Sequence, residues 1–385
     1  MAGDPMMLVT KLSRRARWAV PVGALVVTGA VMAGSLMSAA QAAPVLPPRT
    51  PAQLLAAVAQ GQAPALTGTV VETASLGLPA LPDTGDPTSI ASLLTGSHTI
   101  QVWYASPQRY RLAVPQSLSE TDVVRNGSKV WLWQSTLNTV TEFTVPATAA
   151  PSPQPPLQPS LTPQQAAQLV LALVGPTTTV SIDTNVTVAG QPAYELVLAP
   201  KDSRSLIGKV RIAIDASNSV PLRLQVFARG AASPAISVGF TAISFGAPSA
   251  ADTSFTPPAG AQVTTANPGS GGGQGPQGGD VTTIGSGWLT VLDMPSAGLL
   301  SGSPVPPAQQ SQGSAESAAA MQALLGSATH VHGAWGTGRL LRTSLVSVLI
   351  TSGGTMFVGA VQPSVLYAAA SQAGHRLGAL PAALP

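Results

Sequence analysis

The chain of 385 residues contains no cysteine. This excludes disulfide bonds, a thiol nucleophile and a lipid anchor on an N-terminal cysteine. Only 9% of the residues are charged, which is low for a soluble protein. A chain of this composition depends on its apolar core for stability. Its weakly charged surface favours apolar partners over strongly charged ones.

Residues suited to catalysis or metal binding are also few. The four histidines are His98, His330, His332 and His375, and no G-x-S-x-G motif occurs. His330 and His332 are placed to share one face of a strand, but no third metal ligand lies near them in the sequence. The glycines at 333–338 do not match a phosphate-binding loop. We therefore predict a protein that is not an enzyme and has no metal or other cofactor.

The first 42 residues predict a signal peptide. Four basic residues between Lys11 and Arg17 precede an apolar run at 18–37, and Ala40-Gln41-Ala42 forms an A-x-A cleavage site. We expect export across the cytoplasmic membrane, into the extracellular or cell-envelope space. The run is also long enough to span a bilayer, so a retained membrane anchor stays the alternative. The richness in alanine, glycine, proline and valine suggests a bacterium with a GC-rich genome.

The sequence pI of about 9.5 comes from this leader. Without residues 1–42 the chain has 14 basic and 14 acidic residues. No basic patch is visible in the remaining sequence, so a nucleic-acid partner is not expected.

A stretch at 98–145 holds six of the sixteen aromatic residues and has a period of two. Val130 and Leu132 alternate with Trp131 and Trp133, for example. Alternation of β-branched and aromatic residues is typical of antiparallel strands, and Asn126-Gly127 suits a tight hairpin turn. The pattern predicts three or four consecutive strands here.

Further alternating runs raise the expected number of strands to about ten. They occupy residues 65–75, 178–188, 192–199, 208–215, 222–228 and 234–245. Helices are predicted after Thr50-Pro51 and after Thr162-Pro163, the second with Leu169 and Leu173 on its apolar side. The predicted fold is α+β and mainly β, with one strongly curved antiparallel sheet.

Composition also predicts the boundaries between parts of the chain. The stretch at 76–97 includes Leu93 and is rich in leucine, which indicates either a packed surface loop or a flap over a pocket. A proline-rich connector is expected at 146–160. The Gly/Pro-rich stretch at 257–280 predicts a flexible linker between a first domain at 43–256 and a C-terminal module at 281–385.

The predicted C-terminal module is small and of mixed α and β structure. We expect a short strand near Trp288–Val291, a helix over 315–325, two strands joined through Ser352-Gly353-Gly354, and a closing helix from Pro363. The sequence indicates no role for it.

Several of these features together resemble a known superfamily. An aromatic strand leads to Pro107-x-Arg109-Tyr110-Arg111, then to the Asn126-Gly127 turn, then to the Trp131-Leu132-Trp133 strand. This order is similar to the lipoprotein-carrier superfamily of LolA, LolB and RseB (MucB), over about residues 50–245, and to its secreted actinobacterial LolA-like members. The resemblance implies a half-barrel whose concave apolar face holds acyl chains under helical lids.

The resemblance also suggests which residues bind the ligand. The apolar lining is expected from Trp103, Tyr104, Trp131 and Trp133, with Leu93, Leu169 and Leu173 from the flap and the second helix. Arg109 or Arg111 is expected to help hold the lid. The alternative is that the aromatic residues form a sealed core and that the two arginines are solvated or pair with Glu120 or Asp122.

Two functions follow from the resemblance. The first is an exported carrier or scavenger that holds the acyl chains of a lipid or lipoprotein. The second is a lipid-sensing regulator of the RseB type, with an anti-sigma factor or another membrane protein as its partner.

Overall fold

The computed structural model describes residues 43–61, 63–77, 95–116, 118–145, 176–266, 281–296 and 325–378. Both sheets of the protein lie in the compact unit that begins at Pro44. No helix in these ranges is long and apolar enough to cross a membrane. The predicted signal peptide, the proline-rich connector, and the helices expected at 163–174 and 315–325 fall wholly or almost wholly outside the described residues.

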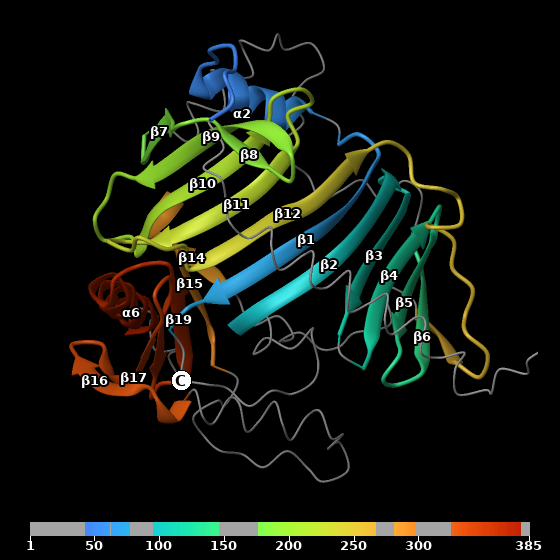
Figure 1. Ribbon diagram of the computed structural model, residues 1–385. Helices are drawn as coiled ribbons and strands as arrows, with labels where there is room; N and C mark the ends of the chain where they lie inside the picture. Colours follow the sequence, from blue (N-terminus) through green and yellow to red (C-terminus); the bar gives the residue numbers. More distant parts are fainter. Residues whose placement is uncertain are drawn as a thin grey trace, which may run out of the picture. The chain divides into compact units, whose positions relative to one another are not determined.

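One large curved sheet of thirteen strands dominates the fold (Figure 1). Its order is β13-β6-β5-β4-β3-β2-β1-β12-β11-β10-β9-β7, with β8 also paired to β9. The strands are β1 (Leu66–Ser75), β2 (Thr95–Ser106), β3 (Arg109–Pro115), β4 (Glu120–Asn126), β5 (Lys129–Gln134), β6 (Thr139–Thr144), β7 (Thr178–Ile182), β8 (Val186–Val188), β9 (Gln191–Pro200), β10 (Ile207–Asp215), β11 (Pro221–Ala228), β12 (Ile236–Phe245) and β13 (Gln262–Ala266). The two outermost strands, β13 and β7, do not pair, so the sheet stays open. The predicted mainly-β fold class is confirmed.

The aromatic stretch forms five strands rather than three or four. The two-residue turn at Pro107-Gln108 separates β2 from β3, and Gly127, with φ of 65°, closes the β4–β5 hairpin as predicted. The run at 178–188 also divides. Ile182 pairs with Leu196, whereas Val186 pairs with Ala193, so β7 and β8 take successive segments of the same strand as partner.

Cross-strand register places each residue of the sheet on one of two faces, because directly opposite residues point the same way. We call one the α2 face, since it carries helix α2 (Pro51–Gln60), and the other the tryptophan face. On the tryptophan face Trp103 lies opposite Arg111, Arg111 opposite Val124, and Val124 opposite Trp131. On the α2 face Val102 lies opposite Leu112, and that row continues through β4 and β5.

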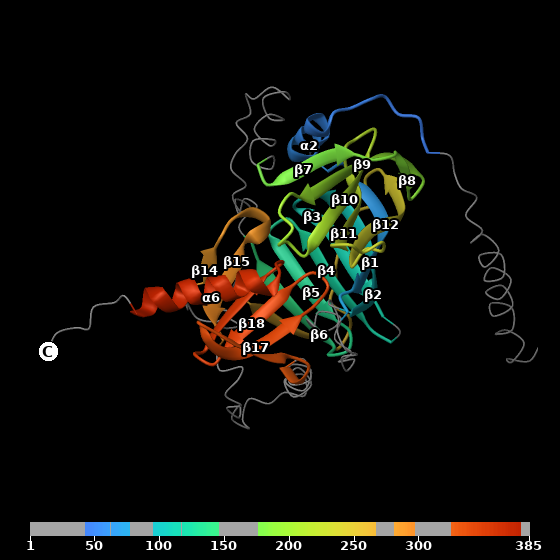
Figure 2. The ribbon, with the colours of Figure 1, turned by 90° about the vertical axis from the view of Figure 1, so that its left-hand side faces the viewer.

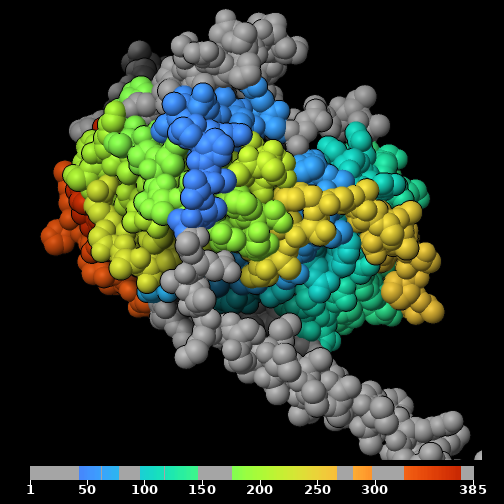
Figure 3. All heavy atoms as spheres, turned by 45° about the horizontal axis from the view of Figure 1, so that its top comes forward, coloured from blue at the N-terminus to red at the C-terminus, as the bar shows by residue number. Residues whose placement is uncertain are grey.

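Helix α2 begins where the sequence predicted. The Thr50 side chain accepts a hydrogen bond from the Gln53 backbone, and the Gln53 side chain accepts one from the Thr50 backbone, which completes a capping box. Leu54 is fully buried and packs with Tyr194, Leu196 and Ile214. The helix therefore covers the end of the α2 face formed by β7, β9 and β10 (Figure 3).

The C-terminal module is a second, six-stranded sheet with one helix along its face (Figure 2). Its core contains Val291, Leu349, Phe357 and Leu366. The elements are β14 (Thr282–Ile284), the 3-10 helix η1 (Gly287–Leu289), β15 (Val291–Pro295), β16 (Thr329–Gly333), β17 (Gly336–Arg342), β18 (Ser347–Thr351), β19 (Thr355–Gly359) and α6 (Pro363–Gly378), in the sheet order β14-β15-β19-β18-β17-β16.

Two predictions for this module were wrong in detail. Trp288 lies in η1, so the strand begins only at Val291. The segment around the Ser352-Gly353-Gly354 turn forms three strands, because the chain also turns between Thr343 and Val346, where Thr343 N donates to Val346 O. The closing helix from Pro363 is confirmed.

A joint of backbone pairing connects the module to the large sheet. Ser205 forms an isolated β-bridge with Val361, Leu206 N donates to Ala360 O at 2.9 Å, and Gln362 N donates to Arg204 O at 2.8 Å. Nearby, Leu345 of the module is buried with Leu76 and Ala235. The module is therefore docked on the first domain through both hydrogen bonds and apolar packing.

The ordered chain extends beyond the predicted boundary at 256. After β12 the chain, yellow in Figure 3, reaches β6, where β13 pairs in parallel. Asn138 Nδ2 also donates to Gly260 O at 2.9 Å. This part of the predicted linker is thus part of the sheet, while 267–280 lies outside the described residues.

Limited proteolysis tests this extension. We expect the first cut in the Gly/Pro-rich segment to fall after Ala266, because backbone held in a sheet is a poor protease substrate. The measurement is the mass of the first N-terminal fragment. A fragment ending between Pro257 and Gln262 would show that β13 does not protect this segment.

Candidate functional site

The α2 face carries a continuous apolar row across neighbouring strands. In the cross-strand register one such row consists of Val102, Leu112, Val123 and Leu132, which lie side by side on β2 to β5. All four are only partly buried. A second row contains Tyr104, Tyr110, Val130 and Phe143, interrupted by Arg125. Partly buried apolar side chains in such rows form a surface that can accept an apolar ligand.

The tryptophan face of the same strands contains several fully buried residues. Ala113, Asp122, Val124 and Val140 are each at most 2% exposed. Trp131 packs near Phe255 with ring centroids 6.0 Å apart, which brings the chain after β12 onto this face. Trp103, Trp131 and Trp133 on this face are partly buried, like the rows of the α2 face. Among the described residues of β3 to β6, however, all the fully buried ones lie on the tryptophan face, and this contrast favours the α2 face as the side available to a ligand.

Helix α2 and the C-terminal module mark the two limits of the apolar surface on the α2 face. Helix α2 packs against Ile212 and Ile214 of β10 at one end. At the other end Val226 of β11 packs against the cluster that contains Leu345 of the C-terminal module. Between them Leu224 of β11 is 37% exposed. Among the described residues, Leu224 thus marks an open part of the α2 face between two covers.

The structure separates the aromatic residues that the sequence grouped together. Tyr104 lies on the α2 face, whereas Trp103, Trp131 and Trp133 lie on the tryptophan face. Adjacent residues of a strand point to opposite sides, so Trp103 and Tyr104 cannot line the same surface. Leu93, Leu169 and Leu173 lie outside the described residues.

Arg111 has the acidic partners that the second interpretation assigned to it. Its Nη2 lies 2.5 Å from Asp122 Oδ2 and 3.2 Å from Glu120 Oε1. The guanidinium also lies over the Trp103 ring at 5.3 Å. Arg109, by contrast, is an exposed residue opposite Asn126. Arg111 therefore belongs to the tryptophan face, on the opposite side of the sheet from the α2 surface.

Burial changes the ionisation of Asp122. Removal from water raises the pKa of this carboxyl to about 7, a hydrogen bond with Glu120 acts in the same direction, and the charge of Arg111 partly opposes both. One oxygen, Oδ1, is buried without a hydrogen-bond partner. The site is consistent with a structural ion pair under strong desolvation.

A second polar cluster on the tryptophan face was not singled out from the sequence. Glu195 is 3% exposed and pairs with both Arg211, at 3.3 Å, and Arg223, at 2.8 Å. Arg211 also pairs with Asp183. In the sequence the only indication was one acidic residue and two arginines in three separate runs with a period of two. No motif links these three runs. Each charge has an opposite partner, so the cluster closes this face rather than opening a site.

Within the described part of the chain, no three histidine or acidic side chains gather as possible metal ligands. His330 and His332 are exposed on β16, opposite Arg339 and Thr337.

Comparison with known proteins gives matches to solved structures only. No family model matches, and no curated protein sequence matches. The MucA/MucB complex of Pseudomonas aeruginosa has 15% identity, covers 83% of this chain and 94% of that one, and has a TM-score of 0.41. An uncharacterised conserved protein of Thermus thermophilus has 14% identity, covers 56% and 98%, and has a TM-score of 0.31.

A LolA superfamily protein of Nitrosomonas europaea also matches, with 12% identity, 54% and 99% coverage and a TM-score of 0.20. The solved structures to which this chain is similar thus include MucB and a LolA superfamily protein. At these identities and TM-scores the similarity says nothing about function.

Proposed function

We propose that the protein is a non-catalytic binding protein that holds acyl chains of a lipid or lipoprotein on the α2 face. The observation that supports this most directly is the contrast in burial between the two faces of β2 to β5. The described residues of the apolar rows on the α2 face are all partly exposed, while four residues of the tryptophan face are at most 2% exposed.

Such a surface supplies enough free energy for a lipid. Burial of an acyl chain contributes about 0.8 kcal/mol per CH₂ group. A chain of about sixteen carbons thus offers on the order of 10 kcal/mol before the costs of association. The interaction depends on apolar area and shape, and needs no catalytic group.

The position of the C-terminal module favours a second candidate, a lipid-sensing regulator with an anti-sigma factor or another membrane protein as partner. Val226, on the α2 face that would hold the ligand, packs against the cluster that contains Leu345 of the module. A ligand on that surface would therefore alter the environment of the module. The carrier proposal does not require this coupling, and the regulator proposal does.

Two leucines of equal exposure give a matched test of the binding surface. Leu224 on the α2 face and Leu292 on β15 are both 37% exposed. We expect Leu224→Gln to weaken binding of a fluorescent long-chain fatty acid about tenfold, which corresponds to ~1.4 kcal/mol. We expect Leu292→Gln to bind as the wild type does.

The measurement is a fluorescence titration of full-length protein that has been delipidated and refolded. Both substitutions are at partly exposed positions, so each should change the free energy of unfolding by only about 0.5 kcal/mol. Equal affinities of the two variants for the fatty acid would show that the α2 face is not the binding site. Absence of any binding by the wild type at micromolar concentration would refute the carrier proposal itself.

A further inference from the structure

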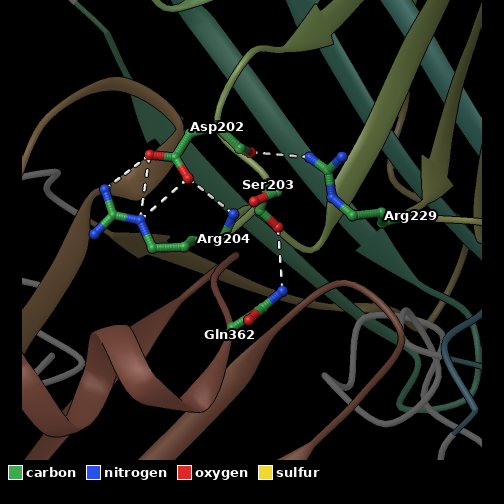
Figure 4. Close-up of polar contacts among 5 residues, drawn as sticks. All are labelled: Asp202, Ser203, Arg204, Arg229 and Gln362. Atoms are coloured by element: carbon green, nitrogen blue, oxygen red, sulfur yellow. Dashed lines mark hydrogen bonds and ion pairs between the residues drawn. The ribbon is translucent and has the colours of Figure 1, made fainter.

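The polar side chains that Figure 4 shows at the joint are already engaged in hydrogen bonds. Arg204 donates to Asp202 through Nε and Nη2, at 2.7 to 3.2 Å. Arg229 Nη2 donates to Asp202 O, and Gln362 Nε2 donates to Ser203 O. The Arg204–Asp202 pair has no net charge, so it favours neither a cationic nor an anionic ligand.

A different group of nitrogen-bearing side chains lies on the hairpin of β16 and β17 (Figure 1). His330 and His332 share one face of β16, and Arg339 and Thr337 of β17 lie directly opposite them. Together with Ser352 they line a hollow of about 320 Å³. The sequence already placed the two histidines on one face, and the hairpin adds a guanidinium to them.

The hairpin fixes the positions of these side chains. Val331, between the two histidines, packs against the core of the module, so the histidines point to the other side of the sheet. At the hairpin turn Trp335 stacks on Tyr367 of α6, with ring centroids 5.6 Å apart. Ser352 Oγ donates to Thr337 O at 3.1 Å, which ties the next turn of the module to β17.

Most donors of this group are not used within the described part of the chain. Arg339 Nη1 donates to Leu325 O at 3.4 Å, while Nε and Nη2 have no partner among the described residues. Neither His330 nor His332 forms a side-chain hydrogen bond or ion pair there, and both are exposed. The N–H groups of three side chains are therefore available to a ligand in the hollow.

None of the described residues that line the hollow is acidic. Asp293 is the one acidic residue in the described part of the module, and β19, β18 and β17 separate its strand, β15, from β16. With strands ~4.8 Å apart, this is roughly 19 Å, well beyond the Debye length of about 8 Å at physiological ionic strength. Arg339 thus makes the hollow positive, and histidine adds charge as the pH falls from about 8 to 5.

The charge distribution favours an anion over a metal ion. Two imidazoles are common zinc ligands, but Arg339 lies directly opposite His330, with Cβ atoms about 5 Å apart, and its permanent charge would repel a cation. An anion is attracted by the same charge and can accept from all three side chains. We propose that the hollow binds the phosphate group of a phosphate ester, held by Arg339, His330 and His332. This site lies outside the acyl surface and does not depend on it.

Isothermal titration of the full chain with phenyl phosphate and with benzoate at pH 6.5 tests the class of ligand. We expect phenyl phosphate to bind at least tenfold more tightly, because its additional charge and oxygen can engage all three side chains. Equal affinities of the two probes would overturn the assignment to phosphate.

Two arginines of β17 give a matched test of the location. Arg342 is exposed on the same strand as Arg339, but an odd number of residues away and so on the opposite face. We expect Arg339→Gln to weaken phenyl phosphate at least tenfold and Arg342→Gln to leave its affinity unchanged. Equal losses in both variants would show that the probe responds only to the overall charge of the module, and would refute the site.

Sulfate isolates the contribution of the histidines, because its charge is constant between pH 5.5 and pH 8. Its affinity should rise at least tenfold as the pH is lowered across this range. In the double variant His330→Gln/His332→Gln the affinity should no longer depend on pH, since glutamine keeps an N–H donor but gains no charge. A pH dependence that persists in this variant would overturn the role of the histidines.

A soluble phosphate ester and a phospholipid headgroup share this chemistry, and two probes distinguish them. The first is glycerol 3-phosphate, measured by titration. The second is sedimentation with phosphatidylcholine vesicles that contain phosphatidate, with vesicles of phosphatidylcholine alone as the control for the acyl surface. Binding of either probe that is lost in Arg339→Gln supports the proposal and identifies the source. Binding of neither probe would refute it and leave the acyl-chain proposal untouched.

Discussion

Replacing Arg111 with leucine is expected to lower the free energy of unfolding by roughly 3 kcal/mol at pH 8, because it removes one partner of a buried ion pair. Asp122 is 1% exposed and its Oδ2 accepts from Arg111. Without the guanidinium, an ionised Asp122 has only the half-exposed Glu120, of like charge, beside it. Urea unfolding of the full chain at fixed pH gives the measurement.

The loss should depend on pH in a defined direction. The folded-state pKa of Asp122, about 7, lies above its ordinary value of 3.8. Between these values the folded state binds more protons than the unfolded state, so stability falls as pH rises through this window. Removing Arg111 raises the folded-state pKa further. At pH 5 Asp122 is protonated in both proteins, and the difference between them should shrink to about 1 kcal/mol.

Asp122→Asn is the control, because asparagine cannot ionise. In that background Arg111→Leu should cost nearly the same at pH 5 and pH 8. A constant cost of Arg111→Leu with Asp122 present would show that the ion pair is not its source. Unchanged stability together with altered fatty-acid uptake would instead support the role in holding a lid that the resemblance implied for Arg109 or Arg111.

The sequence was informative about the strands because their period of two is a local property. Val130-Trp131-Leu132-Trp133 already divides into two faces without any knowledge of the fold. The capping box at Thr50 and the proline at the start of α6 are equally local. Strand number was less accurate, because the turn at Pro107-Gln108 is only two residues long and interrupts no hydrophobic pattern.

Which face is packed more deeply could not be predicted from the same pattern. Trp131 is covered by Phe255, more than a hundred residues away in the chain. Leu222 and Leu224 look equivalent in sequence, yet one is 1% and the other 37% exposed. That difference depends on tertiary packing, because Leu222 is buried in a cluster with Val188, Ala193 and Ala213 of other strands. The aromatic residues were therefore assigned to the ligand from their chemistry, and the packing places three of them on the other side.

The joint between the two sheets likewise could not be predicted from local sequence. Ser205 and Val361 belong to segments with no shared motif, and their bridge arises only when both sheets are formed. Composition predicted a boundary, which is a statement about local chain stiffness. It carried no information about whether the module beyond that boundary would dock.

Leu345→Ala is expected to weaken this joint by about 2–5 kcal/mol, the usual cost of truncating a buried leucine. Leu345 is 4% exposed and packs with Leu76 and Ala235. The matched change is Leu349→Ala, which truncates a fully buried leucine inside the module. Both variants should lose stability, but in different places, because the first side chain packs between the sheets and the second within one of them.

Amide hydrogen exchange separates the two effects. In Leu345→Ala we expect faster exchange at Ser344, whose N–H donates to Leu76 O, and at Leu206 and Gln362, whose N–H groups cross the joint. Amides of β17 to β19 should stay protected. In Leu349→Ala the amides of β17 to β19 should be the first to exchange faster than in the wild type. If Leu345→Ala accelerates β17 to β19 as much as the joint, the module has no stability of its own, and its docking is part of one cooperative fold.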